Sequence, residues 1–103
     1  MYASYIEAKV KSGTSTKAIK LAKNMISDVG EIPNVKKFIL IDKGNDYILL
    51  LAFYDTAEEQ EAAGPLAKEL LGRLEYFYVA PPERMQVEVP INHSYEQGEA
   101  IAL

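Results

Sequence analysis

The sequence predicts an α+β domain in which a four-stranded antiparallel sheet carries two helices on one face. Three observations lead to this prediction. Stretches with period-two hydrophobicity and stretches with helical periodicity follow one another in the order βαββαβ. Residues 47–54 form a strand that is apolar on both faces, whereas a strand with one wet face alternates. A chain of 103 residues builds one core and cannot cover both faces of such a sheet, so the second face needs another cover, most simply a second copy of the chain.

Composition narrows the class of protein. Hydrophobic residues make up 49% of the chain and charged residues 25%, as in folded globular domains. The net charge of −4 argues against a nucleic-acid partner, which would require a basic surface. The absence of cysteine excludes disulfides, thiolate nucleophiles and cysteine-ligated metals. No apolar run approaches the ~20 residues that span a bilayer, and residues 1–10 lack the pattern of a signal peptide, so we expect a cytoplasmic protein with no membrane partner.

Two different hydrophobic periodicities indicate the first strand and the first helix. Residues 2–11 alternate, with apolar side chains at positions 6, 8 and 10 and mostly charged side chains at the odd positions between them. Ser12-Gly13 ends this strand, and the three hydroxyl residues that follow are all competent helix N-caps. Apolar side chains then recur at helical spacing over residues 17–29, which predicts an amphipathic helix that ends at Gly30.

The second and third strands form a predicted hairpin. Residues 35–42 are the second strand and residues 47–54 the third. The connecting Lys-Gly-Asn-Asp is rich in residues that tolerate positive φ, as a tight hairpin loop requires.

The second helix begins after the third strand and is interrupted once. Thr56 and Glu59 fit a capping box, in which each side chain satisfies a free backbone donor of the other residue. Gly64-Pro65 predicts a break, because proline lacks the backbone donor and favours the first position of a renewed helix. The apolar face then continues to Tyr78, and Pro81-Pro82 ends the element.

The last strand completes the topology. Residues 84–91 alternate again and form the fourth strand. Right-handed crossovers then place the first and third strands at the centre of a ferredoxin-like sheet, with both helices on one face. We expect residues 1–91 to form this domain and residues 92–103 to form a C-terminal tail, which is either disordered or an arm that lies on a partner.

One apolar set of the third strand must face away from the helices. The two alternatives are Tyr47, Leu49, Leu51 and Phe53, or Ile48, Leu50, Ala52 and Tyr54. Either set exceeds the apolar patch that monomeric soluble proteins usually expose. We therefore predict a homodimer joined through this sheet face.

Several motifs carry a resemblance to a known family. They are Val-Lys-Ser-Gly-Thr at residues 10–14, Pro-Asn-Val at residues 33–35, Phe-Tyr-Asp-Thr-Ala-Glu-Glu at residues 53–59, and Pro-Pro-Glu at residues 81–83. With these motifs, residues 2–91 resemble the dimeric α/β-barrel superfamily, and within it the antibiotic biosynthesis monooxygenase-like (ABM-like) domains. The resemblance implies that the sheets of two subunits pack face to face as a barrel, with Leu49, Leu51 and Phe53 in the dimer interface. It also implies a ligand site between sheet and helices, and oxidation of an electron-rich aromatic substrate by molecular oxygen without metal or flavin.

The haem-degrading members of the superfamily have a different set of residues. They use an asparagine on the first strand and a tryptophan and a histidine on the second helix. This chain has no tryptophan, and its single histidine, His93, follows the last strand. We interpret His93 as an exposed or dimer-contacting residue, and neither a haem site nor a metal cluster can be assembled.

Aromatic and apolar residues around the second helix are the candidate ligand site. A kink at Gly64-Pro65 can hold the helix away from the sheet and leave a cavity for a flat, apolar molecule. The candidate ligand-binding residues are Tyr54, Leu70, Leu74 and Phe77, with Arg73 or Tyr78 at the rim. Arg73 would stabilise a substrate anion, and no catalytic residue can be named. The alternative is that these side chains are packed core.

Charged residues offer two further candidates. Glu7 and Lys9 share one face of a central strand, where they would form a structural ion pair or, in a cavity, a candidate base. Five lysines recur on and after the first helix, either as its solvated face or as an anion site: Lys17, Lys20, Lys23, Lys36 and Lys37. Two functions therefore stay open. One is a cofactor-independent monooxygenase of a small aromatic substrate, and the other is a non-catalytic dimer that binds a small ligand or serves a structural role.

Overall fold

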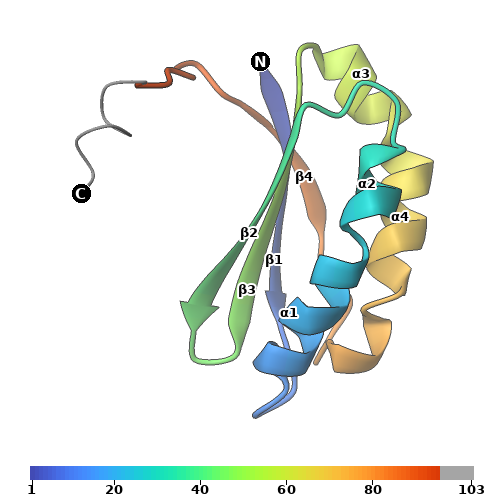
Figure 1. The fold of residues 1–103 in the computed structure, drawn as a ribbon, viewed down its shortest axis with the longest axis vertical. Coiled ribbons are helices and arrows are strands. Elements are labelled where there is room, and N and C mark those ends of the chain that lie inside the picture. Colours follow the sequence, from blue (N-terminus) through green and yellow to red (C-terminus); the bar gives the residue numbers. More distant parts are fainter. Residues whose placement is uncertain (96–103) are drawn as a thin grey trace.

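The computed structural model describes residues 1–95 and has two layers, a twisted sheet and a set of helices on one of its faces (Figure 1). The strands are β1 (Tyr2–Lys9), β2 (Lys37–Gly44), β3 (Tyr47–Tyr54) and β4 (Arg84–Glu88). The helices are α1 (Ser15–Asn24), α2 (Ile26–Gly30), α3 (Ala57–Ala62), α4 (Gly64–Gly72) and the short 3-10 turn η1 (Glu75–Phe77). The strand order is β2-β3-β1-β4 with every pairing antiparallel. The predicted ferredoxin-like topology is confirmed, with the first and third strands at the centre.

The register of the central pair decides which side chains face the helices. Ile6 of β1 lies opposite Leu50 of β3, and Glu7 lies opposite Leu49. Ile6 and Leu50 are buried beneath the helices, so the even-numbered residues of both strands share that face. The odd-numbered residues of β3, from Tyr47 to Phe53, are therefore the set on the open face, and the structure decides between the two alternatives left by the sequence.

Local chemistry explains the tight connections. Asn45 and Asp46 both have positive φ, of 55° and 65°, which matches a two-residue hairpin loop whose twist follows that of the strands. The Thr56 hydroxyl accepts a hydrogen bond from the Glu59 N–H at 3.1 Å, so the predicted N-cap is present. The second half of the predicted capping box differs, because the Glu59 carboxylate accepts from the Thr56 hydroxyl at 3.2 Å rather than from its backbone N–H. The predicted break at Gly64-Pro65 is also present, because α3 ends at Ala62 and α4 begins at Gly64.

Several predicted elements differ from the structure in their bounds. The second strand, expected over residues 35–42, is Lys37–Gly44, and the second helix, expected to continue to Tyr78, ends at Gly72 and is followed by η1. The helix expected over residues 17–29 is two helices, because the N–H of Met25 bonds to the carbonyl of Ala22 and tightens that turn. The tightened turn keeps Met25 buried at the join. The strand expected over residues 84–91 ends at Glu88, shortly before Pro90, which has no N–H to give to a ladder. Residues 92–95 of the expected tail have no regular structure, and residues 96–103 lie outside the described part of the chain.

The helix-side core is apolar and continuous. It joins the even-numbered residues of the central strands to α1, α2 and α4, and its largest fully buried side chains are Tyr54, Ile48, Leu74 and Val10. In residues 1–95, no helix is long and apolar enough to cross a membrane.

Removal of the Thr56 side chain tests how much the N-cap of α3 contributes to stability. We expect Thr56→Ala to lower the free energy of unfolding by about 1 kcal/mol, because the Glu59 N–H loses its acceptor at the helix start. Urea titration followed by circular dichroism measures this change. Thr16→Ala is the matched control, since Thr16 is an exposed residue in the first turn of α1, and it should have a much smaller effect. Equal losses in the two variants would contradict the role of the cap.

Candidate functional site

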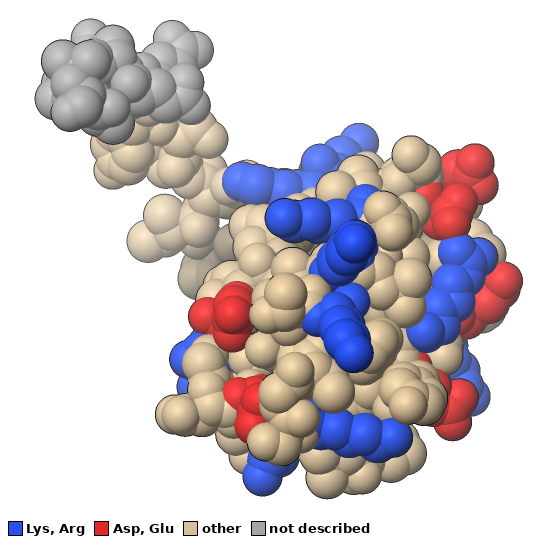
Figure 2. All heavy atoms as spheres, turned by 60° about the horizontal axis from the view of Figure 1, so that its bottom comes forward, with Lys and Arg blue, Asp and Glu red and all other residues tan. Residues whose placement is uncertain are grey.

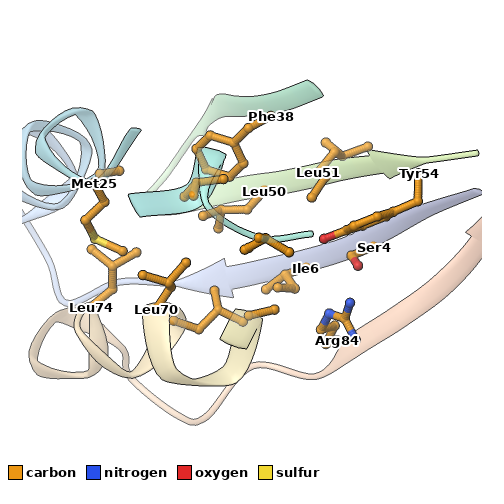
Figure 3. A pocket seen from close by; sticks show the side chains of 16 residues that line it. Ser4, Ile6, Met25, Phe38, Leu50, Leu51, Tyr54, Leu70, Leu74 and Arg84 are labelled. Carbon is orange, nitrogen blue, oxygen red and sulfur yellow. The ribbon is translucent and has the colours of Figure 1, made fainter. Parts of the chain in front are cut away.

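A partly open cavity lies between the sheet and the helices (Figure 3). Its walls come from β1, β2, β3 and β4 on one side and from α1, α2 and α4 on the other, with Ile32 from the loop after α2. The volume within which the centre of a water molecule can move is about 50 Å³. That is room for a few water molecules, since one occupies about 10–15 Å³ on this measure. A single aromatic ring fits only if side chains rotate, and Met25 in the wall has the flexibility to do so.

The cavity is apolar along most of its length. Figure 3 shows Met25 and Leu74 toward one end, Phe38 and Leu50 near the middle, and Tyr54, Ser4 and Arg84 toward the other end. The predicted site residues Tyr54, Leu70 and Leu74 line this space. The structure thus has a cavity between the sheet and the second helix, and the binding of a ligand there stays a prediction.

Polar groups gather at the second end. The Gln60 side chain donates to the Ser4 hydroxyl at 2.9 Å, and both residues are 3% exposed. One terminal nitrogen of Arg84, Nη2, donates to the Gln60 carbonyl at 2.9 Å. The Tyr54 hydroxyl and the Arg84 Nε are both buried and have no hydrogen-bond partner within the described residues. Two donors thus meet an apolar space without acceptors.

The electrostatics make Tyr54 a donor at neutral pH. Burial raises the pKa of the Tyr54 hydroxyl above its usual value, and the neighbouring Arg84 only partly opposes this rise. A tyrosine with a raised pKa keeps its proton at pH 7, so Tyr54 can donate a hydrogen bond but cannot serve as a base. Arg84 carries the positive charge at this end of the cavity.

Arg84, Ser4 and Gln60 were missed by the sequence analysis. Arg84 lies opposite Ile6 in the β1–β4 pairing and therefore projects toward the helices. The alternation of β4 shows that Met85 and Val87 share a face, but does not say which face is the core. In the structure they lie on the open face, which leaves Arg84 and Gln86 under the helices. The only signal in the sequence that could have indicated Arg84 was its position as an isolated basic residue at the start of the last strand.

The remaining predicted site residues lie elsewhere. Arg73 does not reach the cavity, because its guanidinium pairs with Asp28 at 2.6 Å and lies 3.9 Å from Glu69. The Phe77 ring packs against the core and meets the Tyr76 ring edge-on. Tyr78 is buried outside the cavity, where its hydroxyl donates to the Leu71 carbonyl at 3.3 Å, and burial raises its pKa to about 12.

The charged residues singled out by the sequence are placed as follows. Glu7 pairs with Lys43 at 2.8 Å rather than with Lys9, because the hairpin end of β2 brings Lys43 over β1. Lys9 lies 5.7 Å from the centre of the Tyr47 ring. His93 is exposed and contacts Tyr95, with ring centres 4.4 Å apart. Within residues 1–95, no group of histidine, aspartate and glutamate side chains is arranged to hold a metal ion.

Two open grooves adjoin the cavity. The first, of about 440 Å³, runs between α1, α2 and β2 and shares Ala22, Val29 and Phe38 with the cavity wall. The second, of about 650 Å³, lies beside α4 and residues 79–82 and shares Leu71 and Arg84. The wall shared with the second groove thus includes the charged Arg84, whereas the wall shared with the first is entirely apolar.

Comparison with solved structures identifies the fold. A protein of unknown function from Nitrosomonas europaea matches with a TM-score of 0.76 and 11% identity, over 91% of this chain and 93% of that one. A candidate antibiotic biosynthesis monooxygenase from the same organism gives 0.71 and 13%, over 88% and 100%. The ActVA-Orf6 monooxygenase of Streptomyces coelicolor, in complex with nanaomycin D, gives 0.66 and 17%, over 90% and 92%.

These similarities confirm the predicted resemblance at the level of the fold. The chain has the α+β fold of ABM-like proteins along most of its length. At identities this low, the likeness establishes architecture and leaves activity open. Neither a comparison with protein-family profiles nor one with curated protein sequences found a match.

The free hydroxyl of Tyr54 has a measurable consequence for stability. A buried hydroxyl without a partner costs about 1–3 kcal/mol, so Tyr54→Phe should leave the free energy of unfolding unchanged or raise it by about 1 kcal/mol. In Tyr78→Phe, the bond to the Leu71 carbonyl is lost, and we expect a decrease of about 1 kcal/mol. Urea titration of both variants provides the comparison. Equal destabilisation by the two substitutions would show that the Tyr54 hydroxyl is already satisfied.

Proposed function

We propose that this protein binds a small aromatic molecule with an acidic hydroxyl group in the cavity and oxidises it with molecular oxygen, without a cofactor. The observation that carries the proposal is the pair of unpartnered donors, Tyr54 hydroxyl and Arg84 Nε, at the polar end of an apolar cavity. Buried donors favour a ligand that brings an acceptor, because each otherwise stays desolvated without a bond. The apolar walls provide the surface on which a ring packs.

The chemistry follows from these groups. In the proposed reaction, a phenol loses its acidic proton and reacts with oxygen at a ring carbon that bears hydrogen. One oxygen atom becomes a new carbonyl on that carbon, and the other leaves as water together with the two hydrogens that the substrate loses. Arg84 would stabilise the phenolate by charge, and Tyr54 would donate to its oxygen. Neither histidine nor carboxylate is among the lining residues, so the substrate must be acidic enough to lose its proton to water.

Two compared proteins support the reaction class. One is named as a candidate antibiotic biosynthesis monooxygenase, and the other is a monooxygenase solved with nanaomycin D. The absence of a base among the lining residues favours the second candidate function, which is ligand binding without turnover. The two candidates share the cavity and differ only in whether oxygen is consumed.

Oxygen uptake and binding together test the proposal. A panel of quinols and polyphenols is titrated by calorimetry, and oxygen consumption is recorded with each compound. For a compound that binds, Arg84→Met should weaken affinity about tenfold or more, because a charged hydrogen bond contributes about 1.5–3 kcal/mol. Arg73→Met is the matched control, since Arg73 is half-exposed and away from the cavity, and it should leave affinity unchanged.

The outcomes separate the two functions. Uptake of oxygen that falls in Arg84→Met and not in Arg73→Met supports the monooxygenase. Binding that shows the same contrast without oxygen uptake supports the non-catalytic ligand carrier. If no compound binds, or if both arginine variants behave alike, the cavity is packed core and both functions are abandoned.

We also propose that a second copy of the chain covers the open sheet face. The odd-numbered set of β3 is half-buried there, and Ile41 of β2 and Met85 of β4 on the same face are 44% and 48% exposed. The Glu7–Lys43 ion pair and Lys9 lie on this face toward the hairpin end, and the rest of the β3 set is apolar. An apolar patch of this kind is unusual on a monomer. A twofold pairing of two identical sheets would bury it on both copies.

A pair of lysine substitutions in neighbouring residues tests the assembly. Leu49 faces the open side and Leu50 faces the core, so the two substitutions probe opposite faces of one strand. We expect Leu49→Lys to yield a folded monomer, because lysine is solvated on an open face and disrupts an apolar interface. Leu50→Lys should unfold the protein, since an unpaired buried charge costs several kcal/mol. Sedimentation velocity and circular dichroism distinguish these results, and wild-type assembly by Leu49→Lys would overturn the proposal.

A further inference from the structure

Charge is strongly segregated along this acidic chain. Residues 8–41 contain seven lysines and only two acidic residues, although the whole chain carries a net charge of −4. Figure 2 shows Lys and Arg side chains gathered across one face of the molecule, with few acidic side chains between them. A positive face on a negative protein attracts anions through its local potential, whatever the net charge.

The groove between α1, α2 and β2 combines this charge with an apolar floor. Ile19, Ile26, Val35 and Leu40 contribute apolar surface, and the lysines among its lining residues are Lys23, Lys36 and Lys37. Ile26 is 59% exposed, which is unusual for a large apolar side chain next to a groove. The groove also shares the side chains of Ala22, Val29 and Phe38 with the internal cavity. Only apolar residues therefore lie between the cavity and this basic groove.

We infer that this groove is the entrance to the cavity, and that Lys23 and Lys36 select ligands whose outer end carries a negative charge. The inference rests on the proposed function, because it concerns a ligand of the same cavity. It adds a substrate class to that function. The ligand has an apolar body, a hydrogen-bond acceptor at the inner end for Tyr54 and Arg84, and an anionic group such as a carboxylate or sulfonate at the outer end.

The two lysines are available for such a group. Lys23 is an exposed residue in the last turn of α1 and makes no ion pair within the described residues. Lys36 lies 3.6 Å from Asp55, and both side chains are about half exposed. An exposed pair at this distance is worth little, so a ligand anion can compete with Asp55 for Lys36.

The position of the groove fits the internal geometry. Phe38 lies opposite Ala52 of β3, which in turn lies opposite Ser4 of β1, so the basic groove and the polar end are separated across the sheet by the central strands. Figure 3 shows Phe38 near the middle of the cavity, with Ser4 and Arg84 to one side. The second groove has mixed charge, with Lys68 and Glu75 among its lining residues, and it shares the Arg84 and Leu71 side chains with the cavity wall. Charge complementarity therefore favours the first groove for an anionic ligand.

Two fluorescent probes with the same ring skeleton test this inference on the whole protein. Anilinonaphthalene sulfonate carries a negative group, and N-phenyl-naphthylamine lacks it. Lys23→Met/Lys36→Met removes both charges and keeps the aliphatic stems. We expect this double variant to weaken the sulfonate probe about five- to tenfold, as two partly exposed ion pairs allow, and to leave the neutral probe unchanged. Lys17→Met/Lys20→Met is the matched control, because these exposed lysines of α1 do not line the groove.

Each result supports or overturns the inference. A selective loss for the sulfonate in the groove variant, with recovery in Lys23→Arg/Lys36→Arg, supports it. Equal losses in the control variant would show a general effect of surface charge and overturn it, as would equal losses for the two probes or no loss at all. Circular dichroism confirms that each variant is folded. Probe binding requires no turnover. The probe test can therefore succeed or fail independently of the oxygen-uptake test.

Discussion

The pairing of β1 with β3 is the constraint from which the site follows. Side chains alternate between faces along a strand, so a slip of one residue would exchange every inward side chain for an outward one. The observed register places Ser4 beside Ala52 and Tyr2 beside Tyr54, so the serine and Tyr54 lie on the helix side of the sheet. The pairing of β4 with β1 adds Arg84 to the same face. The polar end of the cavity is thus fixed by backbone hydrogen bonds rather than by loops.

The short helix α3 closes that end of the cavity. Six residues are too few for a stable isolated helix, so α3 depends on its cap and its contacts. Two side chains of β4 donate to its backbone, Arg84 to the Gln60 carbonyl and Gln86 to the Ala57 carbonyl at 3.2 Å. The Gln60 side chain in turn holds the Ser4 hydroxyl. Arg84 therefore has a structural role, because its terminal nitrogen holds α3. The same side chain lines the cavity and leaves its Nε without a partner, so it also has the proposed role in ligand binding.

The order of the elements could be predicted because it depends on local patterns. Alternation, the cap at Thr56 and the break at Gly64-Pro65 each act within a few residues, and the structure has all of them. The polar end of the cavity depends instead on which face of β4 turns inward, and that is decided by pairing with a strand almost 80 residues away. Arg73 illustrates the same limit, because its partner Asp28 comes from α2. Hydrophobic periodicity shows which residues of an element share a face. Only the pairing of elements in three dimensions shows which neighbour that face contacts.

The two faces of β3 correspond to the two proposals, ligand binding on the helix side and assembly on the open side. The even-numbered residues Leu50, Ala52 and Tyr54 line the cavity, and the odd-numbered residues of β3 lie on the open face, although Leu51 also reaches the cavity wall. All the lining residues come from a single chain. Under the two proposals, the apolar side chains on the two faces of this strand would have different roles, one in the cavity and the other in assembly. Such a double role would account for the lack of the alternation that is typical of a sheet with one wet face.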